Sequence, residues 1–170
     1  MSACLKFVQR VTRAFVNAGG HDATCYPGLH IHTAKPGHII GQFTIQKQNL
    51  NRLKTLHGGV ICSLTDTMGS LALASKGLYS TGVSTDIHTT FVAPGKDQET
   101  VTVEGKVISL GKTLATTRFE LRHPDTNALL AFGSHTKFVG KAHTHPENVE
   151  FDESGEKVIK GKQPNEWAED

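Results

Sequence analysis

The sequence is poor in several features that define large classes of proteins. Its three cysteines, Cys4, Cys25 and Cys62, are odd in number and have no Cys-x-x-Cys spacing, which fits a reducing compartment rather than a disulfide framework. No apolar run approaches the length needed to cross a membrane. The net charge is only +2, and no basic run interleaves with aromatic residues. We therefore expect neither a membrane span nor a nucleic-acid partner.

Two groups of polar residues that invite a chemical interpretation lack the necessary pattern. His143 and His145 are near neighbours, but no cysteine or carboxylate stands at metal-site spacing from them. Ser84, Asp86 and His88 alternate along one expected strand, which does not give the geometry of a nucleophile, its base and an orienting acid. We predict no metal site and no serine triad.

Length and composition predict one folded domain with a polar end. A chain of 170 residues with 37% hydrophobic residues can bury one core and has little room for a second. We expect that domain over residues 21–140, after an N-terminal helix over 1–20. Residues 141–170 are rich in Glu, Asp, Lys and Asn and have too few apolar residues for a core of their own. We expect a flexible tail; the alternative is a segment that packs on a neighbouring subunit.

The first twenty residues predict an amphipathic helix. Lys6, Arg10 and Arg13 fall on one side of it, apolar residues fall on the other, and no acidic residue precedes Asp22. This pattern is typical of a mitochondrial presequence, and also of a surface helix belonging to the domain. A cytoplasmic and a mitochondrial location therefore both remain open.

The longest helical pattern lies between Asn51 and Lys76. Apolar residues recur there at spacings of three and four, and a glycine, Gly77, marks the end of the helix. Its entrance is polar and flexible, since His57 and two glycines precede the apolar stripe. The first N–H groups of a helix have no acceptor within it, and they suit a developing oxyanion. The stripe comprises Val60, Ile61, Leu64, Met68, Leu71 and Leu73.

The remaining periodic segments predict strands. Two runs precede the central helix, around Leu29–Ile31 and Ile39–Ile45, and four runs follow it, at 80–92, 100–108, 113–122 and 129–139. One long buried helix and about six alternating strands give an α+β fold. A curved antiparallel sheet wrapped around the helix would bury the apolar faces of both.

Asp66 is the conspicuous polar residue of the central helix. It puts a carboxylate into an otherwise apolar segment, and its helical neighbours three and four residues away are small. Most aspartates on helices are simply exposed, but here the small-residue face leaves room for another molecule to approach. Those neighbours are Cys62, Ser63, Gly69 and Ser70.

Four motifs together resemble a known family. Asn51, Leu56-His57-Gly58-Gly59, Asp66 and Gly82-Val83-Ser84-Thr85-Asp86 stand at the spacings found in hotdog-fold acyl-coenzyme A thioesterases. The sequence is most similar to the thioesterase superfamily member two type, related to the phenylacetate-degradation thioesterases. The similarity covers roughly residues 5 to 140. It implies the hotdog fold, a long helix wrapped by a curved antiparallel sheet.

The resemblance also implies a reaction and its residues. Acyl-CoA would be hydrolysed to a free acid and coenzyme A without a metal or an organic cofactor. Asp66 matches the general base or nucleophile, and the sequence does not separate these two roles. The Gly58 N–H matches the oxyanion donor. His57 and Asn51 match residues that bind or polarise the thioester, although His57 also suits a helix cap, and Ser84 matches a residue that orients water.

Coenzyme A brings phosphates, so a basic rim is expected. The resemblance puts nucleotide contacts near strand ends, where the candidates are Lys112, Thr113, Arg118, His135 and Lys137. The acyl chain is expected to be shaped by residues such as Leu64, Met68 and Phe91. An alternative function is a non-catalytic acyl-CoA or lipid-binding protein that keeps the pocket.

The spacing of two site residues predicts a homo-oligomer. Gly58 and Asp66 are eight residues apart, so a helix separates them by about 12 Å along its axis. A thioester carbonyl must lie within about 3 Å of the oxyanion donor and within reach of the base. Two antiparallel helices from identical chains can meet this requirement where one helix cannot. The resemblance implies the same dimer, often paired again into a tetramer.

Overall fold

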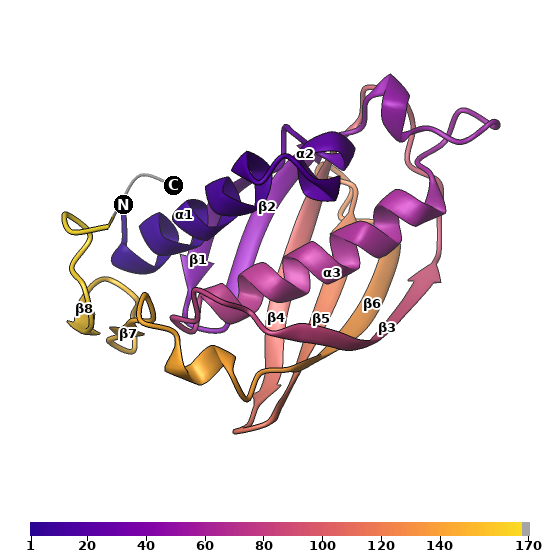
Figure 1. Cartoon of the computed structure of the whole chain (residues 1–170). Coiled ribbons are helices and arrows are strands. Elements are labelled where there is room, and N and C mark those ends of the chain that lie inside the picture. The colour runs from indigo at the N-terminus through magenta and orange to yellow at the C-terminus, as the bar shows by residue number, and fades with distance from the viewer. Residues whose placement is uncertain (168–170) are drawn as a thin grey trace.

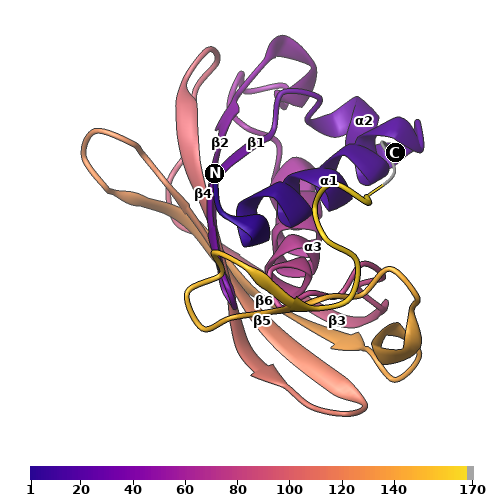
Figure 2. The same cartoon turned by 90° about the vertical axis from the view of Figure 1, so that its left-hand side faces the viewer.

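The computed structural model describes residues 1–167 and is organised around one helix, α3 (Gly58–Ala74). Six strands form a single antiparallel sheet of order β1-β2-β4-β5-β6-β3. The sheet curves around α3, and both long helices lie on its concave side (Figures 1 and 2). The predicted α+β hotdog arrangement is therefore confirmed. The strands are β1 (His30–Lys35), β2 (His38–Thr44), β3 (Val83–Phe91), β4 (Thr100–Leu110), β5 (Leu114–Arg122) and β6 (Leu129–Phe138).

The core lies between α3 and the sheet. Leu64, Met68 and Leu71 are fully buried, as their spacing on one helical face predicts. Strands β4 and β5 meet them with alternating apolar side chains, of which Val103 and Phe119 are buried and their polar neighbours point away. Burial of each large side chain contributes about 1.5–3 kcal/mol to folding, so this packing fixes which face of α3 remains available to a ligand.

Strand β3 is an edge of the sheet. It pairs with β6 on one side and stands last in the strand order, so within residues 1–167 its other edge has no partner strand. Large apolar side chains on β3 are exposed, with Val83 at 67%, Ile87 at 40% and Phe91 at 56% of their full area. An exposed apolar edge is a template for pairing with another chain.

The N-terminal helix α1 (Ala3–Asn17) is part of the folded domain. It is followed by a short helix, α2 (His21–Cys25). Phe7, Val8 and Val11 of α1 are almost completely buried, and Ser2 caps the helix by accepting a hydrogen bond from the Leu5 N–H. The apolar side predicted from the sequence thus faces the core, as a surface helix of the fold requires.

The C-terminal segment, residues 141–167, packs against α1 and the end of α3, which corrects the expectation of a flexible tail over this range. The last three residues of the expected tail, 168–170, lie outside the described residues. The C-terminal segment contains a short hairpin, β7 (Glu150–Phe151) and β8 (Val158–Lys160). Val149 and Val158 belong to the main core, and Figure 2 shows this segment crossing beside α1. By composition the segment has too few apolar residues for a core of its own. Its few apolar residues instead join an existing one.

The described part of the chain also contains two short 3-10 helices, at Lys47–Asn49 and Ala142–Thr144. No helix within residues 1–167 has both the length and the hydropathy needed to cross a membrane.

Candidate active site

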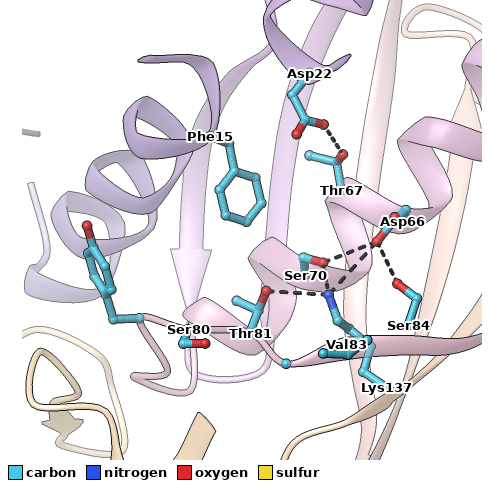
Figure 3. Close-up of a pocket in the computed structure, with 12 residues that line it drawn as sticks. Phe15, Asp22, Asp66, Thr67, Ser70, Ser80, Thr81, Val83, Ser84 and Lys137 are labelled. Atoms are coloured by element: carbon cyan, nitrogen blue, oxygen red, sulfur yellow. Dashed lines mark hydrogen bonds and ion pairs between the residues drawn. The ribbon is translucent and has the colours of Figure 1, made fainter. Parts of the chain in front are cut away.

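Asp66 lies at the middle of α3 beside a cavity of about 490 Å³. The cavity is bounded by α1, α2, α3 and the segment that leads into β3 (Figure 3). The Asp66 side chain is 43% exposed, in contrast to the buried apolar face of the same helix. The small neighbour Ser70 lines the same cavity. The predicted open face around the carboxylate is therefore present, and a cavity of this volume is of the size that holds small ligands.

Four polar side chains converge on one oxygen of this carboxylate. The hydroxyls of Ser70 and Ser84 each donate to Asp66 Oδ1 at 3.4 Å. His135 Nε2 lies 3.6 Å and Lys137 Nζ lies 3.9 Å from the same oxygen. No residue in the described part of the chain hydrogen-bonds to Asp66 Oδ2. One oxygen is therefore held in place while the other can accept a proton or a bond.

Lys137, on β6, is a buried cation behind the carboxylate. Only 4% of the residue is exposed. Its Nζ donates to Ser70 Oγ at 2.5 Å and to Thr81 Oγ1 at 3.4 Å. Burial lowers the pKa of the Lys137 ammonium from its usual value, and the negative charges of Asp66 and Asp22 oppose that shift. Lys137 and Ser70 thus form a chain of donors that ends at Asp66.

His135 forms a second, parallel chain of donors. It lies two residues before Lys137 on the same face of β6, and its Nε2 is 2.9 Å from Ser84 Oγ. Only 1% of the residue is exposed. Burial and the charge of Lys137 lower the pKa of the imidazole, against the effect of Asp66. A neutral ring with its proton on Nε2 can donate to Ser84, which donates to Asp66.

A glycine makes room for this histidine. A Cβ added to Gly69 would lie 2.9 Å from His135 Nδ1 and 2.5 Å from Thr117 Oγ1. Both separations are too short for real side chains, so any larger residue at position 69 would displace the His135 ring. The small residue that the sequence marked as part of the open face therefore serves the buried side of α3.

The contact between Ser84, His135 and Asp66 is not a serine triad. In a triad the carboxylate accepts from the imidazole nitrogen opposite the one that faces serine. Here Asp66 and Ser84 both approach Nε2, and His135 Nδ1 has no hydrogen-bond partner among residues 1–167. The arrangement directs donors toward a carboxylate rather than activating the serine.

The entrance of α3 carries the other predicted catalytic residues. The Asn51 carboxamide oxygen accepts from the N–H groups of Leu53 at 2.8 Å and Thr55 at 3.2 Å, so it shapes its own loop. His57 Nδ1 accepts from the Gly59 N–H at 2.9 Å, which is the helix-cap role that the sequence also allowed. No described residue accepts a hydrogen bond from the Gly58 N–H. That donor is available at the positive end of the helix.

Only part of the expected basic rim lies at the surface. Lys112 and Thr113 are exposed at the turn between β4 and β5. Arg118 is exposed on β5, where it pairs with Glu120 at 2.8 Å. His135 and Lys137 are buried beside Asp66, so the expectation that they form a solvent-facing rim for phosphates is wrong. Alternation along β6 points both side chains toward α3.

Asp22 is a site residue that the sequence interpretation missed. It lies on α2, lines the cavity, and accepts hydrogen bonds from Tyr26 Oη at 2.5 Å and from Thr67 Oγ1 at 2.7 Å. Figure 3 shows Asp22 above Thr67, with Phe15 of α1 pointing into the space between the helices. Asp22 follows two glycines that mark the end of the first helix. Nothing in the local sequence shows that α2 folds back onto α3.

Within residues 1–167 no group of three or more His, Cys, Asp or Glu side chains is arranged to hold a metal ion. The polar groups around Asp66 are instead bound to one another, as described above.

Comparison with known proteins gives a consistent family. The sequence model of the thioesterase superfamily matches residues 53–129. A Schizosaccharomyces pombe protein with the provisional name of esterase is 41% identical over 145 residues, which cover 85% of this chain and 89% of that protein. Human acyl-coenzyme A thioesterase 13 is 35% identical over 108 residues, or 64% of this chain and 77% of the human protein. The crystal structure of zebrafish thioesterase superfamily member 2 matches with a TM-score of 0.75 and 28% identity, over 82% of this chain and 99% of that chain.

Proposed function

Because this chain belongs to the thioesterase superfamily, a family of thioester hydrolases, we propose that it hydrolyses acyl-coenzyme A to a carboxylic acid and free coenzyme A. The observation that carries this proposal is the carboxylate of Asp66, held by one oxygen beside a cavity. The similarity to a human protein named for that activity supports the choice of acyl-CoA as substrate. The side chains of the protein itself would do the chemistry.

Asp66 Oδ2 is the reactive atom in this proposal. As a general base it takes a proton from a water molecule, whose oxygen attacks the thioester carbonyl carbon. As a nucleophile it attacks that carbon itself and forms an anhydride, which water then hydrolyses. In both routes the carbon–sulfur bond breaks. In the first, the protonated Asp66 gives its proton to the departing sulfur; in the second, the thiolate of coenzyme A leaves and takes a proton from the water that hydrolyses the anhydride. Ser84, bound to Asp66 and His135, is positioned to orient the water.

The Gly58 N–H is the proposed oxyanion donor. It lies at the start of α3 and has no acceptor among the described residues, so it can bind the negative charge that develops on the carbonyl oxygen. A donor of this kind accelerates acyl transfer by about 100-fold to 1,000-fold. His57 and Asn51 would hold the loop that presents this N–H, in keeping with their hydrogen bonds there.

Two chains are needed to bring Gly58 and Asp66 onto one carbonyl. Within α3 they are about 12 Å apart along the axis, which exceeds the reach of a single carbonyl group. Strand β3 runs beside α3 and has an exposed apolar edge. Pairing of two β3 edges about a two-fold axis would set two α3 helices antiparallel. The start of one helix would then face the middle of the other. We therefore propose a homodimer, or a dimer of such dimers, with shared sites.

Complementation tests the activity and the shared site together. Chains carrying Asp66→Asn are mixed with chains carrying Gly58→Pro, which removes the donor N–H, and thiol release from acyl-CoA is followed with a thiol-reactive dye. Each variant alone should be nearly inactive, while the mixed dimer should regain one intact site of its two. Native mass spectrometry verifies that subunits have exchanged.

The outcomes separate the alternatives. A wild-type protein that binds acyl-CoA but releases no thiol would be a non-catalytic binding protein. Active wild-type protein, with verified exchange of folded variants and no recovered activity, would mean that each site lies within one chain.

We propose a cytoplasmic or mitochondrial location, in which α1 stays part of the working protein because it contributes core residues to the fold.

A further inference from the structure

The loop between α3 and β3 forms one wall of the Asp66 cavity. Tyr79, Thr81 and Val83 of this loop and of the start of β3 line the cavity, together with Phe15 from α1. Among residues 1–167, the aromatic residues that line it are Phe15 and Tyr79. The residues that the sequence suggested for the acyl chain are elsewhere: Leu64 and Met68 are fully buried, and the Phe91 ring stands beside Gly58.

The backbone of this loop is tied to the C-terminal segment. The Tyr79 N–H donates to Asn148 Oδ1 at 2.9 Å, and the Val149 N–H donates to the Gly77 carbonyl at 3.0 Å. Gly77 has a φ of +89°, and a Cβ there would lie 1.8 Å from the Val149 carbonyl oxygen. Only glycine permits this approach. The end of α3 is therefore shaped to receive the segment.

The Tyr79 ring is also held by side chains of the C-terminal segment and of α1. The His145 ring stacks on it with centroids 5.1 Å apart and an interplanar angle of 24°. The Arg10 guanidinium lies 4.6 Å from the centre of the Tyr79 ring, and the Phe7 ring meets it edge-on at 6.4 Å. Such cation–π and aromatic contacts each stabilise one orientation of a ring. His145 belongs to the C-terminal segment, and Arg10 and Phe7 belong to α1.

The C-terminal segment is itself anchored firmly enough to act as a support. The Phe151 and Trp167 rings pack against Phe7, with centroids 5.8 and 5.3 Å from its own. Glu147 pairs with Arg10 at 3.0 Å and also with Lys162. The C-terminal segment thus contacts both α1 and the loop after α3. Tyr79, in that loop, packs against the segment and against α1.

We propose that the C-terminal segment, residues 141–167, fixes Tyr79 as a wall of the acyl pocket and thereby limits the length of acyl chain that the enzyme hydrolyses. This inference rests on the proposed thioesterase function. An acyl chain attached to a carbonyl at Asp66 can extend through the cavity toward Phe15 and Tyr79. A wall that cannot move excludes chains that would overlap it, whereas a mobile side chain would swing aside.

The experiment measures kcat/KM for saturated acyl-CoA substrates from butanoyl to hexadecanoyl. Replacing Tyr79 by alanine removes the ring, and the ratio of long-chain to short-chain kcat/KM should rise by about tenfold or more, the scale of a few methylene groups in an apolar pocket. His145→Ala removes the stacking ring, together with the acceptor of the Glu147 N–H at 3.2 Å, and should shift the same ratio in the same direction, by about threefold. His145→Phe keeps an aromatic ring there and should restore the wild-type ratio.

His143→Ala is the matched control. His143 lies in the short 3-10 helix that ends just before His145, but its Nε2 contacts the Gly111 carbonyl oxygen rather than Tyr79, so the length profile should not change. Circular dichroism establishes that each variant is folded. If Tyr79→Ala does not fold, the His145 pair decides the question.

The possible failures are distinguishable. A wild-type enzyme that releases no thiol from any member of the series overturns the proposed function, and this inference with it. Active, folded Tyr79→Ala and His145→Ala variants with the wild-type length profile overturn the inference alone.

Discussion

The two regions of α3 that carry the predicted site residues differ in what holds them together. At the entrance, the side chains of Asn51 and His57 hydrogen-bond within five residues of themselves. At the middle, Asp66 is held by Ser84 from β3 and approached by His135 and Lys137 from β6, which lie about seventy positions further along the chain. The entrance offers an unused backbone donor but no carboxylate. The middle offers a carboxylate but no unused backbone donor, so each region supplies what the other lacks.

The difference indicates how each region can be disturbed. A change of the Asn51 or His57 side chain acts on local backbone geometry, because the hydrogen bonds of these two side chains are short-range. A change at Asp66 acts on a network of side chains from three elements, so its members should affect one another. Substitutions in the two regions should therefore differ in the size and in the range of their effects.

Replacing Asp66 by asparagine, in the middle region, should cause the largest loss of activity. The substitution keeps size and shape but removes the base or nucleophile, so kcat should fall by about 100-fold or more. Binding of the substrate should be mostly retained. Steady-state thiol release measures kcat, and Asp125→Asn, in the exposed turn before β6, is the matched control. Wild-type turnover in the Asp66 variant would exclude this carboxylate from the chemistry.

Replacing Ser84 by alanine should have a smaller effect on the same region. The variant loses the hydroxyl that links His135 to Asp66, and a hydrogen bond to a charged group contributes about 1.5 kcal/mol, which corresponds to about tenfold in rate. We expect kcat to fall by about tenfold, with little change in KM. The neighbouring change Thr85→Val removes a hydroxyl that donates instead to the Thr136 carbonyl oxygen at 3.0 Å. Equal losses in the two variants would mean that the link to Asp66 has no special role.

The entrance can be tested through its helix cap. His57→Ala removes the acceptor for the Gly59 N–H and should lower the free energy of unfolding by about 1 kcal/mol. His57→Asn supplies another good capping side chain and should restore most of that stability. Thermal unfolding measures both. If the asparagine variant is stable yet much less active, His57 contributes to catalysis beyond capping; equal activity would reduce it to a cap.

The smallest effect at neutral pH should be a change in the pH dependence of stability. The pKa of His135 is lower in the folded protein than its usual value, so the unfolded chain binds more protons when pH falls below about 6.5. Stability contributed by the neutral ring is therefore present above that pH and is lost as pH falls toward the folded pKa. The His135→Gln variant should lose less stability between pH 7 and pH 5 than the wild type does.

His88→Gln, on the exposed strand β3, is the comparison for this measurement. Denaturant unfolding at several pH values gives the change in the free energy of unfolding with pH for each protein. Parallel plots of the free energy of unfolding against pH for the wild type and the His135 variant would mean that protonation of this ring is not coupled to folding.

The same contrast explains how much the sequence could predict. The entrance could be predicted from the sequence because the features that define it are local. The glycines, the capping histidine and the helical stripe follow one another along the chain. The six strands could be predicted because apolar and polar residues alternate along each of them, and this alternation can be recognised without knowing which strands pair. Asp66 stood out as a polar residue on an apolar helix, and the family motif added Ser84.

The surroundings of Asp66 could not be obtained in this way. His135 and Lys137 belong to a strand whose register against α3 decides which side chains are buried, and the sequence suggested an exposed rim instead. Asp22 and Tyr79 reach the cavity because a short helix and a loop fold back onto α3. The C-terminal segment has too few apolar residues to indicate a core, and its docking depends on surfaces of α1 and α3 that exist only after folding.

The exposed edge of β3 has a consequence for how the protein would work at low abundance. If the catalytic unit forms only when two β3 edges meet, the fraction of chains in working sites follows mass action. Specific activity would then fall on dilution below the dissociation constant of the pair, and total activity would rise with the square of the amount of protein. The amount synthesised would thus set the output of a cell more steeply than for a monomeric enzyme.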